Sequence, residues 1–254
     1  MDPQASPHHG GTASPEEVAR FTAMAEAWWD PDGKFKPLHR FNPVRLEFMR
    51  RHFAARFGRD ESAIRPFEGL TLLDVGCGGG LLSEPLARMG FSVTGIDAGD
   101  RNVAIARLHA EQSGVPVEYL AATPERLDPA RMFDVVLCME VVEHVPDVAV
   151  FLGHACARLR PGGVFVGATL NRTLKAYALA VVGAEYIMGW LPRGTHDWNK
   201  FVRPSEFAAM LRPHGVDIRQ MAGMAYSPLT DSWRETGGLD VNYMLVGEKR
   251  RDCS

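Results

Sequence analysis

Two short stretches of the chain hold residues whose types and spacing could do chemistry. Residues 72–80, LLDVGCGGG, end an apolar run in a turn made almost wholly of glycine. Glycine takes positive φ without penalty and leaves the backbone bare, so such a turn presents N–H groups to an anionic or nucleotide-like ligand. The second stretch places Glu140, Glu143 and His144 close together. The first stretch predicts a cofactor site, and the second predicts a metal-binding or acid–base group.

The glycine pattern separates two classes of cofactor. A dinucleotide-binding loop reads G-x-G-x-x-G, but Leu81 stands at the position of its third glycine, which disfavours a nicotinamide oxidoreductase. The pattern D-x-G-x-G-x-G, which begins at Asp74, resembles motif I of the class I S-adenosylmethionine-dependent methyltransferases. On that resemblance, loop amides around Gly76 and Gly78 would meet the methionine carboxylate, and Asp74 its ammonium group, directly or through water. Asp97, 21 positions after Gly76, ends the next predicted strand and suits the ribose hydroxyls.

The acidic stretch after the fourth predicted strand allows three roles. Glu140, Glu143 and His144 could bind Mg²⁺ or another divalent ion, although hard cations prefer oxygen ligands to imidazole. His144 or Glu143 could instead act as a general base toward a phenolic hydroxyl, since histidine titrates near neutral pH. The stretch could also serve only to shape its loop. Met139, at its start, is placed to lie against an adenosine.

Alternating strands and helices position both stretches. Strands are predicted at 72–75, 92–96, 117–120, 133–138 and 164–169, and helices at 82–89, 101–113, 148–159 and 204–211. This alternation predicts an α/β fold with a Rossmann-like, doubly wound sheet of about seven mostly parallel strands. Runs at 216–221 and 241–246 predict an antiparallel hairpin at the C-terminal end. Such sheets bind ligands at the carboxyl ends of their strands, where the glycine loop, Asp97 and Met139 are expected.

The ends of the chain fall outside this alternation. Residues 1–14 are rich in Pro, His, Gly and Ser and predict a disordered tail. Ser14 and Glu17 match a capping box, and Asn42 before a proline repeats the start signal for a second helix. We expect residues 15–60 to form a helical cap over the ligand site; the alternative is that they only cover one face of the sheet. The single domain, 15–254, then continues with a cofactor-binding core (70–170), an apolar insertion (171–203) and a C-terminal helix and hairpin (204–248).

Composition and charge limit the class of protein. With 254 residues and 46% hydrophobic content, the chain can bury one sizeable core. A net charge of −3 gives no reason to expect a nucleic-acid partner, which would normally meet a clustered basic face. The four cysteines lie far apart, which argues against a zinc site or a disulfide framework and suits a reducing cytosol. No secretory signal is visible, so we expect a cytoplasmic protein.

Motifs outside the predicted sheet resemble one family. They are WWD at 28–30, FKPLHR at 35–40, NPVR at 42–45, CME at 138–140, TLNR at 169–172, VGAEY at 182–186, GTHD at 194–197 and VNYM at 241–244. Together with the glycine loop they resemble the ubiquinone biosynthesis O-methyltransferase family over nearly all of residues 18–247.

The resemblance implies an activity, a cofactor and site residues. A member of this family would methylate a catechol-type hydroxyl on a polyprenylated quinol or on a polyprenylated precursor of the phenol or benzoate type, with S-adenosylmethionine as donor, within a ubiquinone-biosynthesis pathway or complex. By the same resemblance, the positions that match the family's cofactor ligands are Arg45, Gly76, Asp97 and Met139. Glu140, Glu143 and His144 match a metal-binding trio attributed to eukaryotic members. The alternatives are a methyltransferase with another lipid or amine acceptor, and a non-catalytic scaffold protein.

An apolar insertion independently favours a hydrophobic substrate. Residues 176–191 are almost wholly apolar and include three aromatic side chains. This run is shorter than the ~20 residues that span a bilayer, while its flanking Lys175 and Arg193 suit an interfacial element. We therefore expect either peripheral contact of residues 175–193 with the inner membrane or a buried lid over the substrate.

Overall fold

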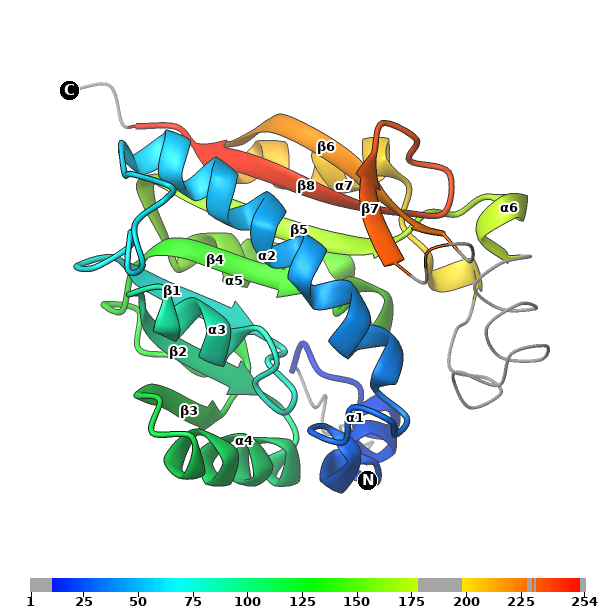
Figure 1. Ribbon diagram of the computed structural model, residues 1–254. Helices are drawn as coiled ribbons and strands as arrows, with labels where there is room; N and C mark the ends of the chain where they lie inside the picture. Colours follow the sequence, from blue (N-terminus) through cyan, green and yellow to red (C-terminus); the bar gives the residue numbers. More distant parts are fainter. Residues whose placement is uncertain (1–10, 178–197, 228–229, 231, 252–254) are drawn as a thin grey trace, which may run out of the picture.

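The computed structural model describes residues 11–177, 198–227, 230 and 232–251, which build one eight-stranded sheet flanked by helices (Figure 1). The strand order is β3-β2-β1-β4-β5-β8-β6-β7. The strands are β1 (Thr71–Val75), β2 (Ser92–Asp97), β3 (Val117–Ala121), β4 (Phe133–Met139), β5 (Leu159–Leu170), β6 (Val216–Ser227), β7 (Ser232–Thr236) and β8 (Asn242–Lys249). The α-helices are α1 (Pro15–Thr22), α2 (Lys36–Phe57), α3 (Ser83–Arg88), α4 (Asp100–Gln112), α5 (Val148–Ala157), α6 (Leu174–Ala176) and α7 (Pro204–Leu211).

Strand directions confirm the predicted Rossmann-like sheet. β1 to β5 pair in parallel, whereas β8 is antiparallel to both of its neighbours, β5 and β6. Between the two runs predicted to form the hairpin, the chain contains a further strand, β7, because β6 continues past Met221 to Ser227 and pairs with it. Trp233 of β7 stacks on Phe41 of α2, with ring centres 4.4 Å apart. β7, the strand that the sequence did not predict, therefore packs on a distant helix, and its own short sequence does not reveal this contact.

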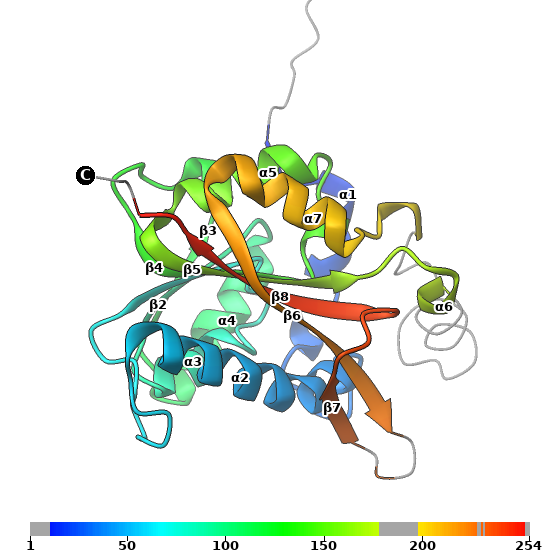
Figure 2. The same ribbon diagram turned by 90° about the horizontal axis from the view of Figure 1, so that it is seen from above.

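Helices cover both faces of this sheet (Figure 2). α2, α3 and α4 lie on one face, and α5 and α7 on the other. Successive residues of β1 enter different layers, since neighbouring strand residues point to opposite faces: Leu72 packs in the core with α2 and α3, and Leu73 in the core with α5 and α7. Burial of both faces is the reason that the parallel strands read as continuous apolar runs.

The second N-terminal helix begins earlier than predicted. α2 starts at Lys36 with Pro37 in its first turn, so Asn42 and Pro43, taken as the start, lie inside the helix. An internal proline removes one helical hydrogen bond. The apolar side of α2, including Phe48, is buried against the sheet and outweighs that loss. Most of α2 thus covers a sheet face, which was our alternative to a cap, and its first turns reach the ligand site described below.

The first helix begins where predicted, but its capping box does not form. Ser14 makes no side-chain cap, and the Glu17 carboxylate lies beside His144 instead. Upstream, Thr12 donates to the carboxylate of Glu125 through its backbone N–H at 2.9 Å and its hydroxyl at 2.7 Å. The predicted disordered tail therefore does not extend to residue 14, because Glu125 fixes Thr12.

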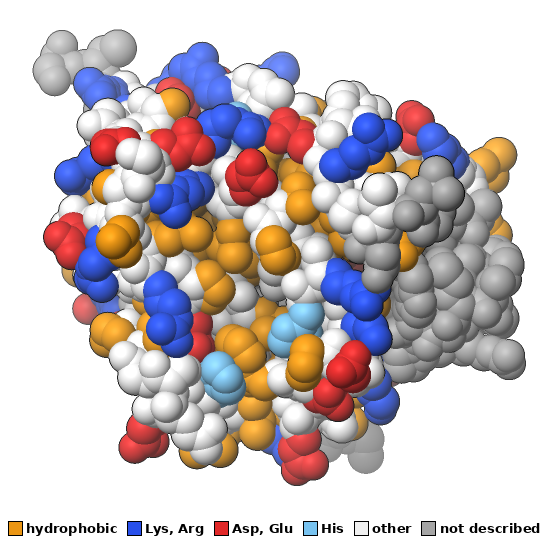
Figure 3. All heavy atoms as spheres, in the orientation of Figure 1, with side chains coloured by type: hydrophobic (Ala, Val, Ile, Leu, Met, Phe, Trp, Pro, Cys, Tyr) orange, Lys and Arg blue, Asp and Glu red, His pale blue; other side chains and the backbone are white. Residues whose placement is uncertain are grey.

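Some expectations fall on residues that the structure does not describe. The first ten residues of the tail and most of the apolar insertion, residues 178–197, lie outside the described residues. Among the helices that are described, none is long and apolar enough to cross a membrane. On the face shown in Figure 3, basic and acidic side chains are interspersed around a hydrophobic middle.

Candidate functional site

A cavity of about 800 Å³ lies at the carboxyl ends of the parallel strands. Residues at the ends of β1, β2, β4 and β5 contribute to its wall, together with the N-terminal segment and the first turns of α2. The predicted site residues that line it are Arg45, Gly76, Gly78, Asp97, Met139, Glu140, Glu143 and His144. Parallel strands place their carboxyl ends at one edge, and this brings together positions that are far apart in the sequence.

The glycine loop after β1 is bent in a way that suits glycine. Gly76 and Gly78 have φ angles of 74° and 53°, the left-handed region that side chains disfavour. A Cβ atom at Gly78 would come within 2.5 Å of the Trp28 ring. The backbone N–H of Gly78 donates to Asp97 Oδ2 at 3.0 Å. The loop is thus held against the end of β2, with its backbone at the cavity wall.

Asp97 accepts three hydrogen bonds from the chain and keeps capacity for more. Gly99 N and Asn102 Nδ2 donate to Oδ1 at 2.8 Å and 3.1 Å, and Gly78 N donates to Oδ2. A carboxylate has about four acceptor sites, so Oδ2 can also accept a hydroxyl from the cavity. This arrangement fits a ribose beside a bare glycine loop, and therefore fits S-adenosylmethionine.

Asp74 does not line the cavity. Its side chain is 1% exposed, and Ser83 Oγ donates to its Oδ2 at 2.6 Å. Burial is the main cause that raises the pKa of Asp74 to about 6. The structure places this residue as a support beneath the glycine loop, and its contact with the methionine ammonium stays a prediction.

Replacing Asp74 with asparagine should stabilise the ligand-free protein more at pH 7.5 than at pH 4. The folded pKa of about 6 exceeds the ordinary 3.8, so the wild type loses stability as the pH rises through that window. Asparagine keeps an acceptor for Ser83 without the buried charge. We expect a gain of about 1–3 kcal/mol in unfolding free energy at pH 7.5, measured by urea titration. An equal gain at both pH values would contradict the raised pKa.

Glu140 pairs with a buried arginine across the cavity. Arg45 Nη2 forms an ion pair with Glu140 Oε1, and its guanidinium lies 3.7 Å from the ring centre of Phe41. Arg45 is only 2% exposed. Among the described residues other than glycine, Glu140 alone has a positive φ, 54°, a conformation that costs of order 1–3 kcal/mol and concentrates at functional sites. The loop after β4 is therefore bent so that this carboxylate meets Arg45.

Glu143 is placed as a neutral acid. It is 4% exposed, and Thr169 Oγ1 donates to its Oε2 at 2.9 Å. Burial, followed by the nearby charge of Glu140, raises the pKa of Glu143 well above its ordinary range. A raised pKa favours the protonated form of Glu143, which can donate a hydrogen bond but cannot accept a proton as a base. Of the two predicted bases, the environment therefore favours His144.

His144 lies against two residues of α1. Its Nδ1 is 3.3 Å from Glu17 Oε2, and its ring meets Phe21 edge-on with centres 5.0 Å apart. The contact with His144 is the largest cause that lowers the pKa of Glu17 to about 2. Sequence reasoning assigned Glu17 to a capping box and missed this contact, because no local pattern links the two residues.

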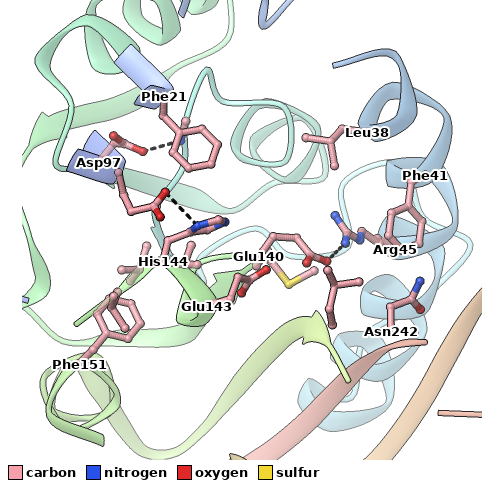
Figure 4. Close-up of a pocket in the computed structure, with 18 of the residues that line it drawn as sticks. Phe21, Leu38, Phe41, Arg45, Asp97, Glu140, Glu143, His144, Phe151 and Asn242 are labelled. Atoms are coloured by element: carbon pink, nitrogen blue, oxygen red, sulfur yellow. Dashed lines mark hydrogen bonds and ion pairs between the residues drawn. The ribbon is translucent and has the colours of Figure 1, made fainter. Parts of the chain in front are cut away.

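Two of the predicted metal ligands, Glu140 and Glu143, interact with each other, and each of the three also has a partner of its own. Figure 4 shows His144, Glu143 and Glu140 in succession, with Glu140 reaching toward Arg45 and His144 lying near Phe21. No group of three or more His, Cys, Asp or Glu side chains in the described ranges could hold a metal ion. As these side chains lie, they do not fit a divalent ion, and the metal role stays a prediction.

Comparisons with known proteins agree in both sequence and fold. Residues 45–221 match a methyltransferase domain family. A protein of Paramagnetospirillum magneticum named ubiquinone biosynthesis O-methyltransferase is 82% identical over 241 residues, which cover 95% of this chain and 97% of that protein. A protein of the same name from Caulobacter vibrioides is 52% identical over 251 residues, covering 98% and 100%. Magnesium protoporphyrin IX methyltransferase from Synechocystis, solved with bound S-adenosylhomocysteine, shares the fold at 17% identity, with a TM-score of 0.61 and coverage of 92% and 93%.

Proposed function

The chain belongs to the ubiquinone biosynthesis O-methyltransferase family, and we propose that its cavity methylates a catechol-type hydroxyl of a polyprenylated ubiquinone precursor. One observation carries the assignment of the site: a single cavity holds both the Gly78–Asp97 pair and His144. The first is suited to a nucleoside, and the second to a hydroxyl that must lose a proton. When bound, S-adenosylmethionine supplies an electrophilic methyl group on its sulfonium.

At the cofactor end, the chain supplies orientation. Asp97 accepts the ribose hydroxyls through Oδ2, while its Oδ1 is held by Gly99 and Asn102. Gly76 and Gly78 let the backbone approach closely, and Met139 lies against the adenosine. Methyl transfer is an in-line displacement, so fixed placement of donor and acceptor lowers much of the barrier.

At the acceptor end, His144 is the proposed general base. Because Nδ1 faces the Glu17 carboxylate, that nitrogen carries the proton and Nε2 is left to accept one. Glu17 thereby fixes the ring and stabilises the imidazolium that forms. The raised pKa of Glu143 makes this residue less suited to the role of base, and Thr169 and Glu140 hold its side chain beside His144.

The charges of the cavity favour an uncharged ring. Every basic side chain among the described lining residues has an acidic partner: Arg45 with Glu140, His144 with Glu17, and Lys175 with Asp240 at 3.1 Å. Among these described residues, a carboxylate on the ring would meet no cation that lacks an acidic partner, and burying an unpaired charge is costly. Of the two precursor types, phenol and benzoate, we propose the phenol.

Binding and turnover together test this function. The purified protein should be stabilised in thermal unfolding by S-adenosylhomocysteine and not by NADH, and it should methylate a short-chain demethylubiquinol. An analogue with a ring carboxylate should show a kcat/KM at least about tenfold lower, because its charge is left unpaired. Stabilisation by NADH would contradict the cofactor assignment. Binding of S-adenosylhomocysteine without turnover of the quinol would contradict the acceptor.

A polyprenyl substrate also motivates a proposed membrane contact through residues 175–193. Leu174, directly before this segment, is 80% exposed, and Tyr177, within its described part, is 44% exposed. We expect the protein to float with anionic liposomes, and Leu174→Glu with Tyr177→Glu to weaken that association several-fold. Ile64→Glu, which alters an apolar side chain 88% exposed elsewhere on the surface, is the matched control. Flotation that is absent, or equal in all variants, would remove the membrane contact.

A further inference from the structure

A chain of buried hydrogen bonds joins the N-terminal segment to Asp97. The indole Nε1 of Trp28 donates to Asn102 Oδ1 at 3.0 Å, and Asn102 Nδ2 donates to Asp97 Oδ1 at 3.1 Å. Trp28 is 8% exposed and Asn102 is 1% exposed. Because Asn102 uses its oxygen toward Trp28 and its nitrogen toward Asp97, the two bonds determine the orientation of the amide between them.

The ring of Trp28 also packs against the glycine loop. Cβ atoms built at Gly78 and Gly79 would both collide with Trp28, so the absence of side chains there is what admits the indole. Phe35 also stacks on the indole, with ring centres 3.8 Å apart and planes 7° apart. Trp28 therefore contacts both parts of the proposed cofactor site, the loop by packing and the ribose carboxylate through Asn102.

The next residue makes a second attachment to the same loop. Trp29 Nε1 donates to the backbone oxygen of Gly79 at 2.8 Å, and its ring stacks on His109 of α4 with planes 2° apart. Glu84 fixes that histidine through a 2.7 Å contact with Nδ1. Two consecutive tryptophans thus hold the segment before α2 on the cofactor loop, whereas α1 contacts His144 on the acceptor side.

We propose that Trp28 and Asn102 are positioning residues that couple the ordering of this N-terminal segment to cofactor affinity. The inference rests on the proposed ribose site at Asp97. Asn102 holds Oδ1 so that Oδ2 faces the ribose, and Trp28 holds Asn102. Coupling between two sites is reciprocal. Cofactor binding therefore orders the segment around Trp28, and loosening that segment weakens cofactor binding.

A double-mutant cycle measured by calorimetry with S-adenosylhomocysteine tests the coupling. Trp28→Phe keeps an aromatic ring but removes the donor, and Asn102→Leu removes the amide at similar size. Each should weaken binding roughly tenfold, the effect of losing one hydrogen bond in a chain that ends on a carboxylate. The double variant should also bind about tenfold more weakly, and not by the product of the two single losses, since either change breaks the same chain of hydrogen bonds. Trp198→Phe removes an indole bond to Thr173 O outside the cavity and should bind like the wild type.

Limited proteolysis gives a second readout that does not depend on activity. Lys34 is exposed and lies next to the buried Phe35, so trypsin reports on the order of this segment. Saturating S-adenosylhomocysteine should slow cleavage after Lys34 several-fold in the wild type and in Trp198→Phe. It should give no protection in Trp28→Phe.

The outcomes separate this inference from the proposed function. Suppose that the wild type binds S-adenosylhomocysteine. The coupling is then wrong, and the proposed function stands, if the affinity losses of the two single variants multiply in the double variant. The same conclusion follows if neither single variant loses affinity. If the wild type does not bind it, the proposed function fails first. Should Asn102→Leu not fold, Trp28→Phe decides alone: unchanged affinity with unchanged protection overturns the coupling.

Discussion

Asp97→Ala is expected to weaken S-adenosylhomocysteine binding by at least about a hundredfold. The proposed contact between a carboxylate and the ribose hydroxyls is charge-assisted, and each such bond contributes about 1.5–3 kcal/mol. The variant also leaves the N–H groups of Gly78 and Gly99 without their acceptor, so the glycine loop loses its attachment to β2. Calorimetry at fixed pH and salt measures the loss. The affinity of Asp97→Asn, which keeps one oxygen acceptor, should lie between those of the wild type and Asp97→Ala.

Asp134→Ala is the matched control for this loss. Asp134 also accepts several hydrogen bonds, from the backbone and hydroxyl of Thr71 and from Arg160. It stands at the beginning of β4, at the opposite end of the strands from the cavity. We expect this variant to lower stability while leaving affinity near that of the wild type. Equal affinity losses in both variants would mean that Asp97 acts through stability and that the ribose binds elsewhere.

His144→Ala should lower kcat by about a hundredfold to ten-thousandfold, the range of general acid–base catalysis. Affinity for S-adenosylhomocysteine should change little, because His144 is assigned to the acceptor. Glu143→Gln should keep most of the activity, since the raised pKa of Glu143 favours its uncharged form, which glutamine resembles. Initial rates with a short-chain demethylubiquinol at saturating cofactor measure the difference. His52→Ala, whose ring contacts the backbone of Phe48 away from the cavity, is the control.

Chelation distinguishes the base from the metal ligand. With His144 as base, the wild-type rate should survive EDTA, and His144→Ala should be slow with or without added Mg²⁺. Loss of wild-type activity in EDTA, restored by Mg²⁺, would instead return Glu140, Glu143 and His144 to the metal role. A His144→Ala enzyme that stays fully active in EDTA would remove all three from the chemistry.

The sheet and the cofactor half of the candidate site could be predicted from the sequence because their signals are local. Apolar strands that alternate along the chain with helices determine a doubly wound sheet. Such a sheet brings the carboxyl ends of its strands together. The glycine loop and Asp97 stand at two of these ends, so their place at one cavity follows from strand positions alone. Leu81, at the position of the third glycine, disfavoured a dinucleotide loop.

Only the tertiary structure decided which side chains meet. Glu17 and His144, Arg45 and Glu140, and Trp28 and Asn102 are pairs from separate elements, and no periodicity or spacing encodes such contacts. The same is true of the protonation of Glu143, since burial raises its pKa and burial depends on the whole fold. It also holds for β7, which requires the extended β6 and Phe41. By itself, the sequence predicted that the glycine loop and Asp97 meet at one cavity, whereas packing between distant segments decided how the proposed acceptor side is built, because its charges are set by their neighbours in space.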